Sequence, residues 1–118
     1  MKHTVLVVED DVDASETLRE FLEGEGYEVV VANDGAKGLL AAERIPHLCL
    51  VFLDLFMPVM NGWDFFKAFR ATPRFSAVPV AVVTSAPEQA PMGVAGVLRK
   101  PLALTSVLAT AAKYCPAA

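Results

Sequence analysis

The stretch LCLVFLDLFMPVMNG, residues 48–62, decides the fold that this sequence predicts. Its first six residues are all apolar, without the alternation of a strand that has one face in water. Such a run is typical of a strand buried on both faces of a parallel sheet. The run ends on Asp54, at the edge where open α/β sheets build their sites. Within this stretch alone, a structural Asp54 that accepts loop hydrogen bonds and a functional Asp54 fit equally well.

Four further apolar runs predict strands, at residues 4–8, 27–32, 78–83 and 94–99. Helical periodicity lies between and after them, at residues 13–24, 34–44, 63–71 and 104–114. Asp13 and Glu16 fit a capping box at the start of the first helix. Between residues 85 and 95, Pro91 and Gly93 oppose a regular helix, so we expect at most one or two irregular turns there. Strands that alternate with helices, without a linker or repeat, predict a single α/β domain over residues 1–118 with a parallel sheet.

The composition excludes several classes of protein. The chain has 118 residues, of which 54% are hydrophobic and 20% charged, as in a globular domain with one core. A net charge of −4 without a Lys/Arg cluster argues against direct binding of nucleic acid. No apolar run is long enough for membrane insertion, and the amino terminus lacks the features of a signal peptide. Cys49 and Cys115 lie far apart and are expected to be free thiols in a reducing compartment, the cytoplasm.

Reactive side chains stand where four of the five predicted strands end. Glu9 and Asp10 follow the first strand, Asp54 ends the third, Thr84 follows the fourth and Lys100 follows the fifth. The carboxyl ends of parallel strands meet at one edge of the sheet, so we expect these side chains to converge. This arrangement strongly favours a functional site over a purely structural one.

The residue types at this edge indicate the chemistry. Carboxylates without histidine or thiolate form an oxygen-only site, which favours Mg²⁺. A carboxylate can also attack phosphorus and give an aspartyl-phosphate. Lys100 can hold phosphoryl oxygens as a point charge, and Thr84 can donate a hydrogen bond to one of them. Together these groups would neutralise the charge of a transferring phosphoryl group.

With these residues in place, the chain resembles the receiver domain of bacterial two-component response regulators. The matching motifs are VVEDD (7–11), LDLFMPVMNG (53–62), PVAVVTSA (79–86) and RKP (99–101), in family order. The resemblance implies a doubly wound five-stranded parallel sheet of the flavodoxin-like type, with strand order 2-1-3-4-5. The helix before the fifth strand would be shortened or irregular, because too few residues separate the TSA and RKP motifs.

The resemblance also implies roles at the metal site. Asp54 matches the phospho-acceptor, and Asp10 matches the direct Mg²⁺ ligand. Glu9 matches the acid that holds the metal through water, and Phe56 matches the position whose backbone carbonyl completes the protein ligands.

Further implied roles concern the switch and the partners. Thr84 matches the hydroxyl that moves toward the phosphoryl group, and Lys100 matches the family's lysine, with a cis bond to Pro101. The phosphoryl donor would be a histidine kinase or a histidine phosphotransfer protein. The phosphorylated domain would bind a downstream protein or relay the phosphate. One departure is Val97. At this position the family usually has an aromatic residue, whose ring swings inward when the threonine moves toward the phosphoryl group.

The sequence therefore predicts a receiver that accepts phosphate on Asp54 in a Mg²⁺-dependent reaction and assists its own phosphorylation, rather than an enzyme acting on other substrates. A phosphorylation-independent interaction module is the alternative, favoured by Val97 and the shortened helix. A Mg²⁺-dependent phosphohydrolase is a third reading. It is disfavoured because Phe56 occupies the position where such enzymes typically carry a second acid.

Overall fold

The computed structural model describes residues 3–116 and contains one five-stranded parallel sheet. Its strands are β1 (Thr4–Val8), β2 (Glu28–Ala32), β3 (Leu48–Asp54), β4 (Val80–Thr84) and β5 (Gly96–Arg99). The order across the sheet is β2-β1-β3-β4-β5, and every neighbouring pair is parallel. The predicted doubly wound parallel sheet and its strand order are therefore confirmed.

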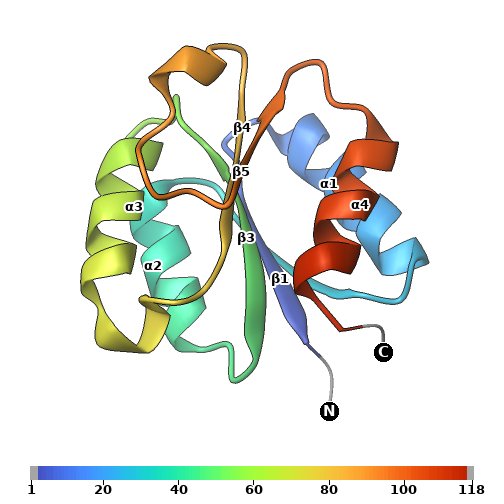
Figure 1. Ribbon diagram of the computed structural model, residues 1–118, viewed down its shortest axis with the longest axis horizontal. Coiled ribbons are helices and arrows are strands. Elements are labelled where there is room, and N and C mark those ends of the chain that lie inside the picture. The colour runs from blue at the N-terminus through green and yellow to red at the C-terminus, as the bar shows by residue number, and fades with distance from the viewer. Residues whose placement is uncertain (1–2, 117–118) are drawn as a thin grey trace.

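Helices cover both faces of this sheet. They are α1 (Val12–Gly24), α2 (Gly35–Glu43), α3 (Gly62–Ala71) and α4 (Leu104–Tyr114), with 3₁₀ turns η1 (Pro73–Phe75) and η2 (Pro87–Gln89). Figure 1 views the sheet from its β5 edge, with α2 and α3 on one side and α1 and α4 on the other. Each side has its own apolar cluster, and Phe65 and Phe69 of α3 are fully buried in one of them.

The register brings the carboxyl ends of the strands to one edge. Val8 lies opposite Leu53, and Asp54 lies opposite Val83. Glu9 and Thr84 therefore lie near Asp54 in the sheet, although they are far from it in the sequence.

Two strands and one helix differ in detail from their predictions. β4 begins at Val80, because Pro79 has no N–H to give to a sheet ladder, and β5 begins at Gly96, two residues later than its predicted run. In α2, the apolar side chain of Leu40 is 58% exposed. Gly38 faces the core instead, where an added Cβ would lie 3.0 Å from the Phe65 ring and 3.1 Å from a Val8 methyl group. Close packing of α2 thus depends on a missing side chain.

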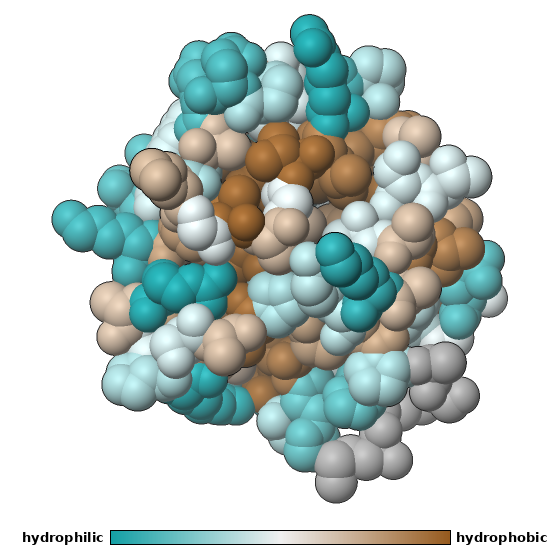
Figure 2. Space-filling view, viewed as in Figure 1, coloured by the Kyte–Doolittle hydropathy of each residue, from teal (hydrophilic) through white to brown (hydrophobic). Residues whose placement is uncertain are grey.

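The segment between β4 and β5 contains only the short turn η2, as the sequence predicts. Because no full helix covers this edge of the sheet, apolar side chains reach the surface. Met92 is 95% exposed and Val97 is 38% exposed. Figure 2 shows apolar surface in the middle of the face that carries this edge.

The prediction of two free thiols is wrong. Cys49, near the start of β3, and Cys115, directly after α4, form a disulfide with Cα atoms 5.3 Å apart. Both sulfur-bearing residues are buried. Local sequence patterns do not predict this pairing, because 66 residues separate the cysteines. Their proximity arises only when α4 packs back along the sheet and ends beside the start of β3.

Candidate functional site

Three carboxylates converge at the carboxyl edge of the sheet. Glu9 follows β1, Asp10 follows Glu9, and Asp54 ends β3. One oxygen of each lies within 4.8 Å of the others. Glu9 and Asp54 are buried, at 3% and 5% exposure, whereas Asp10 is exposed to solvent. The structure thus brings together the acids that the strand ends predicted.

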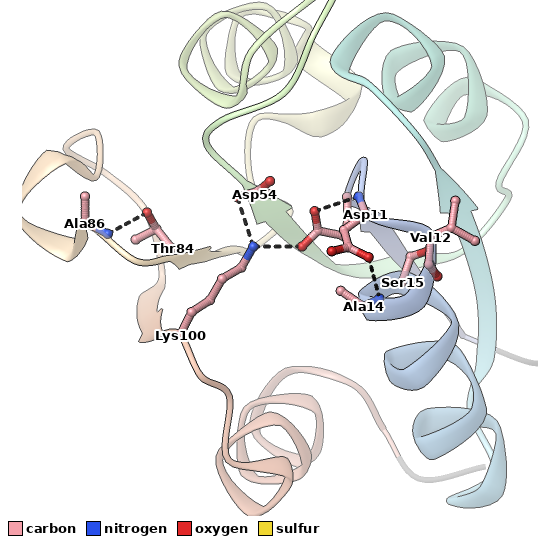
Figure 3. A network of polar contacts seen from close by, with 9 residues as sticks. Asp11, Val12, Ala14, Ser15, Asp54, Thr84, Ala86 and Lys100 are labelled. Atoms are coloured by element: carbon pink, nitrogen blue, oxygen red, sulfur yellow. Dashed lines mark hydrogen bonds and ion pairs between the residues drawn. The ribbon is translucent and has the colours of Figure 1, made fainter.

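Lys100 bridges two of these acids. Its Nζ lies 3.0 Å from Oε1 of Glu9 and 3.5 Å from Oδ1 of Asp54. In Figure 3 the Lys100 side chain points toward Asp54. Burial lowers the pKa of Lys100, but the hydrogen bond and charge of Glu9, followed by the charge of Asp54, outweigh this effect and raise the pKa. The ammonium is therefore held in its charged form beside the carboxylates.

The backbone positions Lys100 as well. It directly follows β5, and its N–H donates to the carbonyl of Thr84, 2.9 Å away. The peptide bond to Pro101 is cis, as the resemblance implied.

Negative charge remains in excess at this site. Burial, then the charge of Glu9, raises the pKa of Asp54 from 3.8 to about 7, and the opposing charge of Lys100 only partly offsets them. A divalent cation would relieve this repulsion. Three clustered carboxylates offer the hard oxygen donors that Mg²⁺ prefers. The residues present therefore fit a magnesium ion held by Glu9, Asp10 and Asp54.

Thr84 lies at the end of β4 but takes no polar part in the carboxylate cluster. It is fully buried, and its Oγ1 accepts a hydrogen bond of 3.0 Å from the N–H of Ala86. Figure 3 shows the hydroxyl directed toward Ala86 and away from Lys100. In this conformation the hydroxyl stabilises the loop that follows β4.

The loop between β3 and α3 is packed against the end of β3. Asn61 caps α3 by accepting from the N–H of Asp64, and the N–H of Gly62 donates to the carbonyl of Leu55 at 2.9 Å. Phe56, whose carbonyl is the predicted metal ligand, has a side chain that is 48% exposed. Its ring meets that of Trp63 edge to face, with centroids 5.2 Å apart.

The sequence reading missed two residues near the site. Asp11, not Asp13, caps α1: its Oδ1 accepts from the N–H of Ala14, and Glu16 pairs instead with Arg19. An Asp directly before a helical pattern is a recognisable signal for such a cap. The second is Trp63, whose indole N–H donates to the carbonyl of Gln89 at 2.8 Å. No local pattern could reveal that contact, because it joins separate elements.

A cavity of about 520 Å³ opens beside the carboxylates, between α1 and the segment that leads into α4. Glu9, Asp13, Lys100 and Leu104 contribute to its lining. The bridging ammonium is thus accessible from this side of the molecule.

Comparison with known proteins identifies the class to which this fold and site belong. The model of the response regulator receiver domain family matches residues 5–112. The chain therefore belongs to the response regulator receiver family.

Among its curated relatives is the DNA-binding response regulator MtrA of Mycobacterium tuberculosis, 39% identical over 85 residues, which are 72% of this chain and 36% of that protein. The transcriptional regulatory protein CpxR of Escherichia coli is 40% identical over 82 residues, 69% of this chain and 33% of that protein. The chain thus spans about a third of the length of these relatives.

Solved structures match nearly the whole chain. The chemotaxis protein CheY4 of Vibrio cholerae superimposes with a TM-score of 0.85 at 29% identity, over 97% of this chain and 99% of that one. The receiver domain of the hybrid histidine kinase CckA gives a TM-score of 0.79 at 26% identity, over 93% of this chain and 96% of that one.

Proposed function

We propose that this chain is a phosphorylation-dependent switch whose Asp54 accepts a phosphoryl group with the help of Mg²⁺. The observation that carries the proposal is the convergence of Glu9, Asp10 and Asp54, with Lys100 bridging Glu9 and Asp54. Buried like charges destabilise the protein, and a bound cation would offset that repulsion and also neutralise the oxygens of an incoming phosphoryl group. Phe56 would add its backbone carbonyl to the metal ligands.

In the proposed reaction, an oxygen of Asp54 attacks the phosphorus of a phosphohistidine on a histidine kinase or phosphotransfer protein. A P–O bond to Asp54 forms, the P–N bond to histidine breaks, and the departing imidazole takes up a proton. When bound, Mg²⁺ neutralises the phosphoryl oxygens and keeps the acids ionised. Lys100 pairs with a phosphoryl oxygen as its contact with Asp54 loosens, and Thr84 turns its hydroxyl toward another.

We further propose that this domain, taken as residues 1–118, contacts proteins rather than nucleic acid. The net charge of −4 supports this, although the relatives named above include a DNA-binding regulator of which the chain matches only a part. The downstream partner would be a protein that recognises the phosphorylated state or receives the phosphate. None of the helices in residues 3–116 has the length and apolar character needed to span a bilayer. We place the domain in the cytoplasm, where histidine kinases present their phosphohistidine.

The proposal is tested by intact-mass measurement after incubation with Mg²⁺ and acetyl phosphate. We expect one phosphoryl group on the wild type and none on Asp54→Asn. Asp64→Asn, an exposed acid in the first turn of α3, is the matched control and should be phosphorylated like the wild type. A wild type that folds normally yet gains no adduct would overturn the proposal.

One observation favours a second candidate, an interaction module that works without phosphorylation. The short turn η2 and the exposed Val97 replace a helix and an aromatic residue that would report the switch. This module would show no adduct and no Mg²⁺ binding in the same experiment.

A further inference from the structure

The turn η2 and its neighbours are held to the rest of the protein by few polar contacts. No residue of η2 is buried, and no side chain caps it. Among the hydrogen bonds of residues 3–116, two tie residues 86–90 to other elements. One runs from the N–H of Ala86 to the hydroxyl of Thr84, and the other from the indole N–H of Trp63 to the carbonyl of Gln89. The polar contacts of this segment with other elements therefore come from the Thr84 hydroxyl and the Trp63 indole, both near the site.

Trp63 links this segment to the acceptor loop. It lies in the first turn of α3 and its ring packs against Phe56, which follows Asp54 by two positions. Figure 1 shows η2 above α3, at the edge where the strands end. One side chain therefore spans the loop that carries the acceptor and the turn that follows the predicted switch threonine.

Phosphorylation would affect these two hydrogen bonds differently. The backbone of β4 is fixed by β3 and β5 on either side, so the Thr84 hydroxyl can reach a phosphoryl group only by rotating. That rotation takes Oγ1 away from the N–H of Ala86. The hydrogen bond of the Trp63 indole to the carbonyl of Gln89 does not involve Thr84 and does not require that rotation.

We infer that Trp63 is a positioning residue that latches residues 86–90 in the unphosphorylated conformation. Phosphorylation breaks the hydrogen bond between Ala86 and Thr84 and leaves the indole hydrogen bond as the remaining polar contact. Residues 86–90 then become more mobile around Trp63. This inference rests on the proposed function and specifies its output. It assigns to η2 the role that Val97, without an aromatic ring, cannot fill.

The latch is tested first without phosphodonor and with Mg²⁺ present, by hydrogen exchange of the backbone amides in residues 86–90, which are those of residue 86 and residues 88–90. Trp63→Phe keeps an aromatic ring against Phe56 but removes the donor. We expect exchange in this segment about 2- to 12-fold faster than in the wild type, the effect of one net hydrogen bond. Gln89→Ala is the matched control, because it removes an exposed side chain and keeps the accepting carbonyl. It should exchange like the wild type.

Amides of α1 serve as an internal reference for global stability. If Trp63→Phe accelerates α1 and residues 86–90 alike, the substitution acts on the whole fold and the inference is overturned. It is equally overturned if the variant and the wild type exchange alike at residues 86–90.

The switch is then tested with acetyl phosphate. We expect phosphorylated wild type to exchange faster at residues 86–90 and to change its fluorescence, which reports Trp63 because the chain has one tryptophan. Asp54→Asn should show neither change. An adduct on Asp54 without faster exchange would overturn the inference and leave the proposed function standing. The absence of any adduct would overturn the proposed function, and the switch with it.

Discussion

At the residue scale, Gly62 shows how closely the start of α3 approaches the backbone of Asp54. A Cβ added there would overlap the carbonyl oxygen of Asp54 and lie 2.7 Å from Cα of Leu55. Both are backbone atoms of a buried segment and cannot move aside cheaply. We expect Gly62→Ala to lower the free energy of unfolding by about 1–3 kcal/mol, and to slow phosphorylation by displacing Asp54.

Gly24→Ala is the matched control for this substitution. No atom lies within 4 Å of the added Cβ, and Gly24 is the last residue of α1. Chemical denaturation should show unchanged stability or a gain of up to about 1 kcal/mol from the better helix propensity of alanine. Equal losses for both variants would show that the close approach at Gly62 is not what matters.

Val59 has a backbone conformation that a β-branched residue rarely adopts. Its φ is +68°, in a tight turn where the N–H of Met60 donates to the carbonyl of Pro58 at 2.8 Å. The side chain is 85% exposed and therefore gains little from packing. We expect Val59→Gly to raise the free energy of unfolding by about 1 kcal/mol. Val97→Gly, in regular strand geometry, should instead lower it, and the reverse order in a denaturant titration would contradict this account.

The pKa of Asp54 predicts a pH dependence of stability. Because this pKa is raised from 3.8 to about 7 in the folded protein, folding favours the protonated acid. The associated stability is fully present below the ordinary pKa and is lost as the pH rises through about 7. Asp54→Asn removes the ionisable group. In Mg²⁺-free buffer, we therefore expect it to stabilise the protein more at about pH 8 than at about pH 4.5.

The check is a pair of denaturant titrations at the two pH values, with a chelator present. Asp64→Asn removes an exposed acid outside the cluster and should have nearly the same effect at both. A stabilisation by Asp54→Asn that does not grow with pH would refute the assignment of excess negative charge to this site.

At the element scale, α4 is held to the sheet by packing and by one covalent bond. Val107 and Ala111 are fully buried on its inner face, and Cys115 joins its end to Cys49. We expect reduction of this disulfide to lower the free energy of unfolding by about 2–4 kcal/mol, because the bond closes a long loop in the unfolded chain.

Denaturation with and without a phosphine reductant measures this difference. The double variant Cys49→Ala, Cys115→Ala should not respond to the reductant. Alkylation in denaturant followed by intact mass then counts the free thiols in protein isolated from cells. Because the cytoplasm keeps most cysteines reduced, the number of free thiols also tests the proposed cytoplasmic location.

At the scale of the whole molecule, binding of Mg²⁺ should stabilise the fold, because the three acids converge only in the folded chain. At about 100 times its dissociation constant, the ion should add about 2.7 kcal/mol to the free energy of unfolding. Asp10→Asn should lose most of this gain. Asp11→Asn should keep it, since Asp11 lies outside the cluster and asparagine can still cap α1. Thermal unfolding at constant ionic strength checks both, and equal responses of the two variants would contradict the site.

Much of the fold could be read from local patterns. The uninterrupted apolar run before Asp54 predicts a strand buried on both faces, and the helical period of residues 104–114 predicts α4 with its observed bounds. Local patterns could not predict features that depend on contacts between separate elements. In α2, Leu40 is exposed and Gly38 faces Phe65 of α3, a contact between helices that no pattern within α2 records.

The sequence by itself determined the order of strands and helices along the chain and the acids and the lysine at the strand ends. It also determined the lack of a regular helix between β4 and β5. These depend on the period of apolar residues and on prolines and glycines, which act over a few positions. Only the tertiary structure decided the Cys49–Cys115 disulfide, the contact of Trp63 with Gln89, and the orientation of the Thr84 hydroxyl. The physical reason is range: the first two join residues far apart in the chain, and the third depends on how the loop after β4 folds back.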